Sequence, residues 1–350
     1  MVTPIISLEV NSLINYKELM RAINFIKQQF FDSLSNELNL IRVQAPLFIP
    51  AGTGLQDMPL NHRNTMSLVN FQYHQLPGIH LETLHSLAKW KRNLISNQGF
   101  EPYSGIYTEG HFIRAYEPKL TPIHSLYVTQ LEWEQTILKK DRNIEYLQST
   151  VRKIFNSLKQ VEEELVKRYS AQLECQLPDQ IQFIHSEELE ERFPNLTPRE
   201  REVSITKEFG AVFIIGIGYP LPKSSQPHGD RNPDQDDWST QNCDNGYRGL
   251  NGDILVWDST LDTALELSSM GIRVCPKSLE LQSIIRGSWE YTKQLDYHKS
   301  IVDEKIVYSI GGGIGIDRVL MWMLRKRHIG EIQVGIWPQE ELKAHPEYLQ

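Results

Sequence analysis

A glycine-rich motif in the last sixth of the chain has the residue types of an anion-binding site. Its sequence is GGGIGIDR, residues 311–318, and an apolar stretch follows it. Glycine has no Cβ, so a ligand could approach the backbone closely, and a helix that begins here would present its N-terminal amides to an anion. Arg318 could then contact a phosphate or stack on a flat ring. The alternative is a plain strand-to-helix turn, and the glycine spacing is not that of a dinucleotide-binding motif.

Two acidic residues further back in the chain could bind a divalent cation. Asp253 and Glu266 lie in the stretches 252–257 and 264–274, which have the composition of two strands joined by a short link. A hairpin would bring the carboxylates together across the ladder, and Mg²⁺, which prefers oxygen ligands, would relieve their repulsion. Arg273 lies at the far end of the second strand. The alternative is a hairpin that merely carries surface acids.

Polar residues alternate along the stretch IHSLYVTQLEWE, residues 123–134, which follows Arg114. In a strand, Gln130, Glu132 and Glu134 point to one face. If that face lines a cavity, Gln130 and Glu132 form a pair of acceptors suited to a substrate ammonium group. The alternative is the solvated side of a sheet.

A basic cluster, HSLAKWKR at residues 85–92, could bind a carboxylate with Ser86 and one of its lysines. Its three cations, Lys89, Lys91 and Arg92, cannot share one helical face. We therefore expect at least one of them to be solvated. The alternative is an ordinary helix with a basic side.

Two loops carry further polar candidates. The glycine-containing segment GTGLQD, residues 52–57, places Asp57 in a loop. The stretch 219–251 has many prolines, glycines and polar residues without periodicity, and it includes Arg231 and Asp236. A loop of this length inside a domain is usually a functional lid or a disordered insert. Either segment could also be plain turn chemistry.

The surrounding pattern predicts one α+β domain over residues 1–350, built on an antiparallel β-sheet flanked by helices. Apolar residues three and four apart predict helices over 17–39 and 143–169, and an apolar helix over 316–324. A short β-like run begins at Ile41 and ends before Pro46. The further strands are expected at 79–84, 105–115, 123–133, 211–217, 252–257, 264–274 and near 332–336.

The amino-acid composition argues against some classes of binding partner and of cellular location. The 350 residues carry 36 basic and 44 acidic side chains, a formal net charge of −8, which argues against a general nucleic-acid binder. The sequence has no apolar run long enough to span a membrane and no visible secretory signal, and its three cysteines lack metal-ligand spacing. We expect a cytoplasmic protein with a local basic site for any anionic ligand.

Taken in order, these motifs resemble the catalytic core of class II aminoacyl-tRNA synthetases, especially the aspartyl and asparaginyl enzymes. The helix over 17–39 ending in VQAP, residues 43–46, is similar to their motif 1. Residues 114–134 are similar to motif 2, and GGGIGIDR is similar to motif 3. The seven-residue spacing from Glu266 to Arg273 also fits the aspartyl pattern.

A closer resemblance covers nearly the whole chain and points to the aspartate–ammonia ligases, the ammonia-dependent asparagine synthetases. It rests on long strings, namely HSLAKWKR (85–92), LNGDILVW (250–257), ELSSMGIR (266–273), DDWST (236–240), LPDQ (177–180) and VGIWP (334–338). The resemblance implies that ATP and Mg²⁺ activate the side chain of L-aspartate as a β-aspartyl adenylate. Ammonia then attacks the adenylate, which gives asparagine and AMP.

The resemblance also implies roles for individual residues. Arg114 would hold the α-phosphate of ATP, Arg318 the γ-phosphate or the adenine side, and Asp253 with Glu266 the Mg²⁺. The remaining ATP-binding candidates are Arg231, Asp236, Glu266, Gly313 and Gly315. The candidates that would bind aspartate are Lys91 and Arg273 at its α-carboxylate, Ser86, Gln130 and Glu132 at its amino group, and Ser269.

The catalytic hypothesis concerns ammonia, which is mostly ammonium at neutral pH and is then not nucleophilic. We expect Asp57, helped by Gln130, to bind this cation and accept a proton beside the anhydride. Arg231 and Asp236 would belong to a lid that excludes water from the adenylate. One departure from the family pattern is Glu132, which stands where an aspartate is expected.

Three other functions remain as alternatives. A tRNA-charging enzyme would need a tRNA-binding module and a basic surface, and a glutamine-dependent synthetase would need a second, hydrolysing domain. The length and charge of this chain favour neither. A non-catalytic paralogue should have lost an ATP or metal residue, but Arg114, Asp253, Glu266 and Arg318 are present. A homodimer follows from the motif 1 resemblance alone.

Overall fold

A large mixed sheet forms the centre of the computed structural model, which describes residues 16–57, 69–115, 119–169, 173–243 and 245–349. Its eight strands lie in the order β1-β5-β6-β11-β10-β9-β8-β7. The two edge pairs, β1 with β5 and β7 with β8, are parallel, and all inner pairs are antiparallel. The bounds are β1 Leu40–Arg42, β5 Gly105–Ile113, β6 Tyr127–Thr136, β11 Ser309–Gly315, β10 Thr263–Ile272, β9 Asn251–Asp258, β8 Ala211–Ile215 and β7 Gln182–His185.

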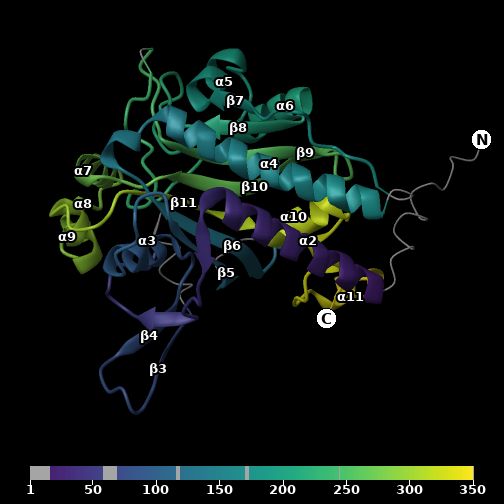
Figure 1. Cartoon of the computed structure of the whole chain (residues 1–350), viewed down its shortest axis with the longest axis horizontal. Helices are drawn as coiled ribbons and strands as arrows, with labels where there is room; N and C mark the ends of the chain where they lie inside the picture. The colour runs from purple at the N-terminus through teal and green to yellow at the C-terminus, as the bar shows by residue number, and fades with distance from the viewer. Residues whose placement is uncertain (1–15, 58–68, 116–118, 170–172, 244, 350) are drawn as a thin grey trace, which may run out of the picture.

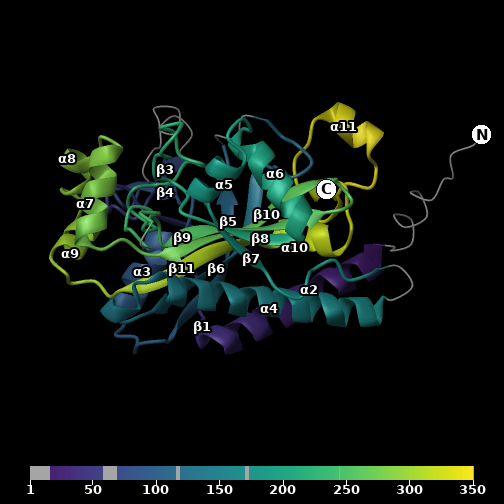
Figure 2. The same cartoon turned by 90° about the horizontal axis from the view of Figure 1, so that it is seen from above.

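Two long helices cover one face of this sheet, as Figure 2 shows from above. They are α2 (Tyr16–Leu38) and α4 (Ile144–Arg168), which pack side by side. Each buries an apolar stripe at helical spacing, for example Ile23, Ile26 and Phe30 in α2. The side chain of Asn143 caps α4 by accepting a hydrogen bond from the backbone N–H of Tyr146 at 2.8 Å.

The opposite face and one end of the sheet carry the shorter helices (Figure 1, Figure 2). Helices α5 (Ser186–Arg192) and α6 (Pro198–Phe209) lie on the face away from α2 and α4, and α6 contacts β8, β9 and β10. Helices α3 (Ala88–Asn97), α7 (Pro276–Ile285), α8 (Trp289–Thr292) and α9 (Asp296–Val302) lie at one end. The last helices are α10 (Ile316–Met323) and α11 (Gln339–Ala344).

A second, three-stranded sheet projects from the body of the molecule (Figure 1). It has the order β2-β4-β3, with bounds β2 Phe48–Pro50, β4 His80–Thr83 and β3 Asn70–Gln72. The strand predicted over 79–84 therefore exists as β4, but it belongs to this small sheet and not to the central one.

Most predicted elements are confirmed within a few residues, including both long helices and the hairpin of β9 and β10. The strand expected near 332–336 is wrong. After a 3₁₀ turn at Ile329–Glu331 this segment is irregular, and the exposure of Val334 (60%) and Ile336 (79%) shows why its apolar residues do not make a strand. No neighbouring ladder covers them in the described residues.

The stretch 219–251 is irregular, as expected, but its centre is packed into the domain. Trp238, Asp237 and Asp234 are fully buried, and backbone bonds join Asp237 to Ile272 and Leu250. The prediction of a lid over this whole stretch is therefore wrong for its centre, because the buried carboxylates pair with fixed cations. None of the helices in the described ranges is long and apolar enough to cross a membrane.

Candidate active site

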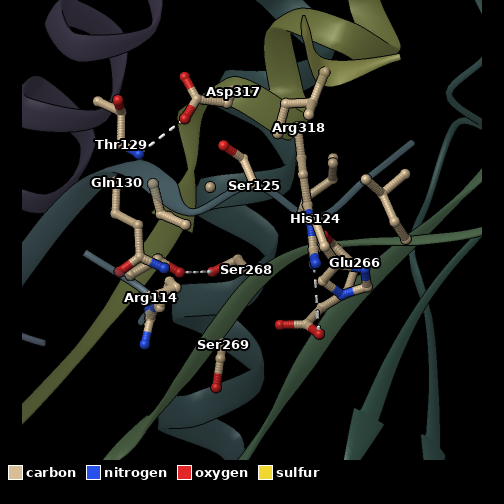
Figure 3. A pocket seen from close by; sticks show the side chains of 16 residues that line it. Arg114, His124, Ser125, Thr129, Gln130, Glu266, Ser268, Ser269, Asp317 and Arg318 are labelled. Carbon is tan, nitrogen blue, oxygen red and sulfur yellow. Dashed lines mark hydrogen bonds and ion pairs between the residues drawn. The ribbon is translucent and has the colours of Figure 1, made fainter. Parts of the chain in front are cut away.

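A cavity of about 260 Å³ opens where the central strands meet the start of α10, as Figure 3 shows from close by. Its polar lining comes from β6, β10, β11, α10 and the segment before β6. The lining includes seven of the predicted site residues, namely Arg114, Gln130, Glu266, Ser269, Gly313, Gly315 and Arg318. It also includes His124, Ser125, Thr129, Ser268 and Asp317. Residues separated by up to two hundred positions in the sequence are thus brought to one hollow.

Charged groups line opposite parts of this cavity. Arg318 lies one turn into α10, where its Nη1 is 3.7 Å from Glu266 Oε2 and donates a hydrogen bond to the carbonyl oxygen of Glu266 at 3.0 Å. Arg114 lies with its guanidinium 5.9 Å from the ring centre of Phe112. Two arginines in the lining of a polar hollow are suited to phosphate oxygens, which accept bidentate hydrogen bonds from guanidinium groups.

The two predicted metal ligands are close but not directly opposite. In the ladder of β9 and β10, Glu266 pairs with Leu255 and Asp253 pairs with Ser269, because a register shift falls between Glu266 and Ser268. Burial raises the pKa of Asp253 to about 7, the Arg231 charge opposes this rise, and Glu266 adds to it. Arg231 Nη2 donates to both oxygens of Asp253. Glu266, which lines the cavity, and the neighbouring Asp253 thus repel each other, and Arg231 offsets this repulsion.

This pair fits a Mg²⁺ ion that is shared with a nucleotide. The described residues contain no group of three or more His, Cys, Asp or Glu side chains that could hold a metal by themselves. Mg²⁺ commonly uses one or two carboxylates and completes its coordination with phosphate oxygens and water. Asp253 and Glu266 supply that number of hard oxygen ligands, and they lie beside the arginines that suit phosphate.

The glycine motif forms a central strand and not a loop. Gly311 and Gly313 lie in β11, between β6 and β10. A Cβ on Gly311 would lie 2.0 Å from Glu134 Oε2, and one on Gly313 would lie 2.9 Å from Glu132 Oε1. The glycines therefore leave room for carboxylates of the neighbouring strand, so the predicted close approach is to protein side chains at these positions.

Five charged side chains pack together behind Gly313. We call them the charge cluster: Lys91, Glu132, Glu134, Asp236 and Arg273. Their exposures do not exceed 7%. Buried ions need charged partners and satisfied hydrogen bonds, since desolvation otherwise exceeds the Coulombic gain.

Lys91 uses all of its donors inside the protein. Its Nζ donates to Glu132 Oε2 at 2.5 Å, to the carbonyl oxygen of Trp133 at 2.9 Å and to that of Gly312 at 2.8 Å. An ammonium group has three N–H donors, so none remains for a substrate in this arrangement. Burial lowers the pKa of Lys91, although Glu132 and Glu134 oppose that shift.

The expectation that one of the three cations would be solvated is wrong. Lys89, Lys91 and Arg92 are all buried, with exposures of 1%, 0% and 1%. Lys89 pairs with Asp234, and Arg92 donates to the carbonyl oxygens of Val307 and Val274 at 3.0 and 2.9 Å. The three cations of α3 therefore all have partners inside the protein.

Arg273 is held by two carboxylates and keeps donors in reserve. Its Nη2 donates to Glu134 Oε2 at 2.7 Å, its Nε donates to Oε1 of the same residue at 3.0 Å, and its Nη1 donates to Asp236. A guanidinium has five N–H donors, and the hydrogen bonds to the described residues leave two of them. Burial alone would raise the pKa of Glu134, but Arg273 outweighs it and holds the pKa below its ordinary value.

Asp236 therefore lies in the charge cluster and not on the wall of the cavity. It was predicted among the ATP-binding residues but does not line the cavity, because it pairs with Arg273, which directly follows β10. Arg231 contacts Asp253, and neither of these two residues is part of the cavity lining.

Asp57 lies near both regions. Its Oδ1 accepts a hydrogen bond from Ser86 Oγ at 2.8 Å and from Gln235 Nε2 at 2.6 Å, and Gln235 is the neighbour of Asp236. Burial lowers the pKa of His85. The charge of Asp57 opposes this shift and that of Arg114 adds to it, so both charges act on the His85 ring. Hydrogen bonds thus join Asp57 to Ser86 and to Gln235, whose neighbour Asp236 belongs to the charge cluster.

Comparison with known proteins matches this arrangement to one family. The family described as aspartate-ammonia ligase matches residues 17–348. The chain belongs to the aspartate–ammonia ligase family. It is therefore an AMP-forming ligase of asparagine biosynthesis, and its fold fits ATP-dependent activation of aspartate. The alternatives of a tRNA-charging enzyme and a non-catalytic paralogue are not favoured.

Solved structures show the same fold in class II synthetases. Asparaginyl-tRNA synthetase from Pyrococcus horikoshii, complexed with asparaginyl-adenylate, has a TM-score of 0.66 at 15% identity, over 91% of this chain and 70% of that one. Aspartyl-tRNA synthetase from Entamoeba histolytica has a TM-score of 0.61 at 15% identity, over 95% of this chain and 62% of that one. At such identities the likeness establishes the class II catalytic fold.

Sequence reasoning missed several residues that position this ligase's candidate site. Ser309 donates to Glu134 Oε1 at 2.7 Å, and Asp317 accepts a hydrogen bond from the backbone N–H of Thr129 at 2.8 Å. Asp317 could have been found, because it stands beside Arg318 in the glycine motif. Ser309 and Gln235 gave no signal, since their partners are distant in the sequence.

Proposed function

We propose that the cavity binds ATP, that the charge cluster and its surroundings bind the α-amino end of L-aspartate, and that ammonia enters beside Asp57. The main observation behind this proposal is that a polar cavity with two arginines lies on one side of Gly313 and the buried charge cluster lies on the other. A molecule that spans the two regions would have one end among arginines and the other among carboxylates.

The first step joins aspartate to the α-phosphorus of ATP. An oxygen of the side-chain carboxylate attacks that phosphorus, and the bond to the β-phosphate bridging oxygen breaks, which releases diphosphate. Arg114 would hold the α-phosphate, and Arg318 would hold the γ-phosphate or the adenine. Fixed cations that match the charge spread over phosphoryl oxygens in the transition state lower the barrier. Backbone of Gly313 and Gly315 would line the nucleotide side.

Asp253 and Glu266 would hold the Mg²⁺ that this chemistry uses. Bound there, the ion would neutralise phosphate charge. Arg231, which contacts both oxygens of Asp253 in the free chain, would have to give up part of this contact or shift toward the phosphates. Asp253→Asn should weaken Mg²⁺-dependent ATP binding about tenfold or more, as measured by calorimetry with and without Mg²⁺, and equal affinity in the variant would contradict this assignment.

The aspartate would lie with its amino end toward the charge cluster. Arg273, which keeps two donors, would bind the α-carboxylate, and Gln130, Glu132 and Ser86 would accept the ammonium group, with Ser269 at the side. Lys91 would act mainly by holding Glu132, since its three donors are occupied. Each charge-assisted contact contributes about 1.5–3 kcal/mol, and an amino acid that leaves one unpaired is rejected.

The second step needs a proton acceptor near the anhydride. Asp57, helped by Gln130, would bind ammonium and take its proton. The nitrogen of the resulting ammonia then attacks the side-chain carbonyl carbon, AMP leaves with the bridging oxygen, and the nitrogen loses a second proton to water to give the amide. The hydrogen bonds from Ser86 and from Gln235, the neighbour of Asp236, support this role because they hold Asp57 beside the proposed aspartate site.

An isotope experiment tests the reaction path. With ATP, Mg²⁺, ammonium and aspartate labelled with ¹⁸O in the side-chain carboxylate, we expect asparagine, diphosphate and AMP that carries one labelled oxygen. Unlabelled AMP, or ADP as a product, would refute an adenylate path. Asp57→Asn tests the second step, because adenylate formation (ATP–diphosphate exchange) should continue while asparagine formation is lost. Equal loss of both would contradict the role of Asp57.

We also propose a homodimer that acts without nucleic acid in the cytoplasm. Support comes from the motif 1 segment, where Ile41 of β1 and Leu47 are 59% and 68% exposed. A second copy of the chain would cover these apolar side chains. Sedimentation of the free enzyme should give a dimer, Ile41→Asp should weaken it, and activity should not require tRNA.

A further inference from the structure

A buried ionic network lies under the loop that carries Asp57. Lys89 Nζ donates to Asp234 Oδ2 at 2.7 Å and to the carbonyl oxygen of Gln56. His298 Nε2 lies 2.7 Å from the same Asp234 oxygen. The side chains are all buried: Lys89 is 1% exposed, and Asp234 and His298 are 0% exposed. The network joins α3, the stretch 219–251, α9 and the loop 52–57.

The protonation of this network follows from its contacts. Burial alone would raise the pKa of Asp234, but Lys89 and His298 outweigh it and lower the pKa to about 2. Asp234 is therefore ionised, and His298 must carry a proton on Nε2 to donate to it. The other ring nitrogen, Nδ1, has no hydrogen-bond partner among the described residues.

The loop is pressed against α9 at this point. Gly54 has a positive φ of 82°, and a Cβ there would lie 3.1 Å from Leu295 Cβ and 3.2 Å from His298 Nδ1. The next residue, Leu55, packs on the apolar group of Val274, Leu279 and Tyr297. Helices α3 and α9 lie at the same end of the sheet in both views (Figure 1, Figure 2).

Two members of the network, Lys89 and Asp234, are close in sequence to groups that touch Asp57. Gln56, whose carbonyl oxygen accepts from Lys89, precedes Asp57 directly. Gln235, which donates to Asp57 Oδ1 at 2.6 Å, follows Asp234. Ser86, the other donor to Asp57, precedes α3 and therefore Lys89. A shift in the network would thus move Asp57 and both of its partners.

We propose that Lys89, Asp234 and His298 are positioning residues for the ammonia step, which fix the loop 52–57 so that Asp57 is held where ammonium must bind. The proposal rests on the function proposed above for Asp57. Fold stability alone is a weak reason for this network, because three buried ionisable groups cost desolvation that apolar side chains of the same volume would not. A network that fixes one geometry is what a proton acceptor needs, since a small misplacement costs rate.

The most informative variants change His298. His298→Gln retains an N–H donor for Asp234, whereas His298→Leu removes it and keeps the volume similar. Gly54→Ala is a second route to the same displacement, because it adds a Cβ against α9 without altering any charge. Glu162→Gln is a matched control: Glu162 is 1% exposed and pairs with Arg325 at 2.9 Å, in a network on α4 that does not include the Asp57 loop.

The measurements separate anchoring from stability. In His298→Leu and Gly54→Ala we expect faster amide hydrogen exchange over residues 51–57, an ammonium KM raised about tenfold, and an aspartate KM and ATP–diphosphate exchange rate within about twofold of the parent. His298→Gln should recover most of the ammonium KM. Glu162→Gln should lower the unfolding midpoint and leave the ammonium KM unchanged.

Two results would overturn the proposal. Unchanged hydrogen exchange over 51–57 in both His298→Leu and Gly54→Ala would show that the network does not hold the loop. Faster exchange with an unchanged ammonium KM would show that the loop's position does not serve the ammonia step. Asp57→Asn, measured in parallel, distinguishes the two claims. A normal ammonium KM in that variant would overturn the function proposed for Asp57 itself, whatever the exchange data show.

Discussion

Replacing Asp317 with asparagine should stabilise the free enzyme at neutral pH and change how its stability depends on pH. Asp317 is 7% exposed at the start of α10, where its Oδ2 accepts hydrogen bonds from the Thr129 backbone N–H at 2.8 Å and from Gln333 Nε2 at 2.5 Å. Burial raises the pKa of Asp317 to about 6, although the hydrogen bonds from Thr129 and Gln333 and the charge of Lys27 oppose this rise.

The size of the effect follows from the shift. The ordinary pKa is 3.8 and the folded pKa is about 6, a difference of about 2.2 units. One unit corresponds to about 1.4 kcal/mol, so the ionised carboxylate costs the fold about 3 kcal/mol. Because the pKa is raised in the folded state, the contribution of Asp317 to the free energy of unfolding is fully favourable below about pH 3.8. It is lost as the pH rises through about 6. Asparagine is neutral throughout and keeps an oxygen for the Thr129 N–H.

Urea unfolding of the ligand-free enzyme and of Asp317→Asn tests this, at several pH values from about 4 to about 8. As the pH rises, the free energy of unfolding of the variant should exceed that of the parent by an amount that grows from near zero to about 3 kcal/mol. Asp262→Asn serves as the control, because the Asp262 side chain is 78% exposed and its φ of 51° also suits asparagine. A constant difference between Asp317→Asn and the parent across this range would refute the reasoning.

Two further predictions concern the charge cluster. Gly311→Ala should raise the aspartate KM strongly, because the new Cβ would lie 2.0 Å from Glu134 Oε2. Gly315→Ala should not clash, since its nearest contact would be at 3.7 Å. Similar kinetics for the two variants would contradict the packing argument. Glu132→Gln should lower the free energy of unfolding by about 3–5 kcal/mol, because it leaves Lys91 buried without its nearest carboxylate. Glu132→Asp, which keeps the charge, should lose less, and equal losses in urea unfolding would contradict this.

Periodic elements could be predicted from the sequence because their signal is local. The stripes of α2 and α4 repeat at helical spacing, and both helices are found within one residue of the predicted bounds. The segment 332–336 has a similar apolar content, but strand formation depends on a neighbouring ladder that a single segment cannot reveal. The same limit explains why β7, paired only with β8, was missed.

The candidate site could be predicted in composition but not in pairing. Arg114, Gln130, Glu266 and Arg318 were expected together, and they line one cavity. Charged residues are usually solvated, so the burial of all three cations of the segment 85–92 was not expected. Glu132, the partner of Lys91, lies 41 positions away. Which buried cation meets which carboxylate depends on how strands and helices assemble.

The distribution of charge indicates which carboxylate of aspartate is activated. In the charge cluster, carboxylates outnumber cations, since Lys91 and Arg273 face Glu132, Glu134 and Asp236. Such a region favours the ammonium group of aspartate, and its one cation with spare donors, Arg273, can accept a single carboxylate beside that ammonium. The second carboxylate would meet repulsion there and attraction toward the arginines of the cavity. In the proposed binding mode, the α-amino end would therefore stay at the cluster and the side-chain carboxylate would face the nucleotide.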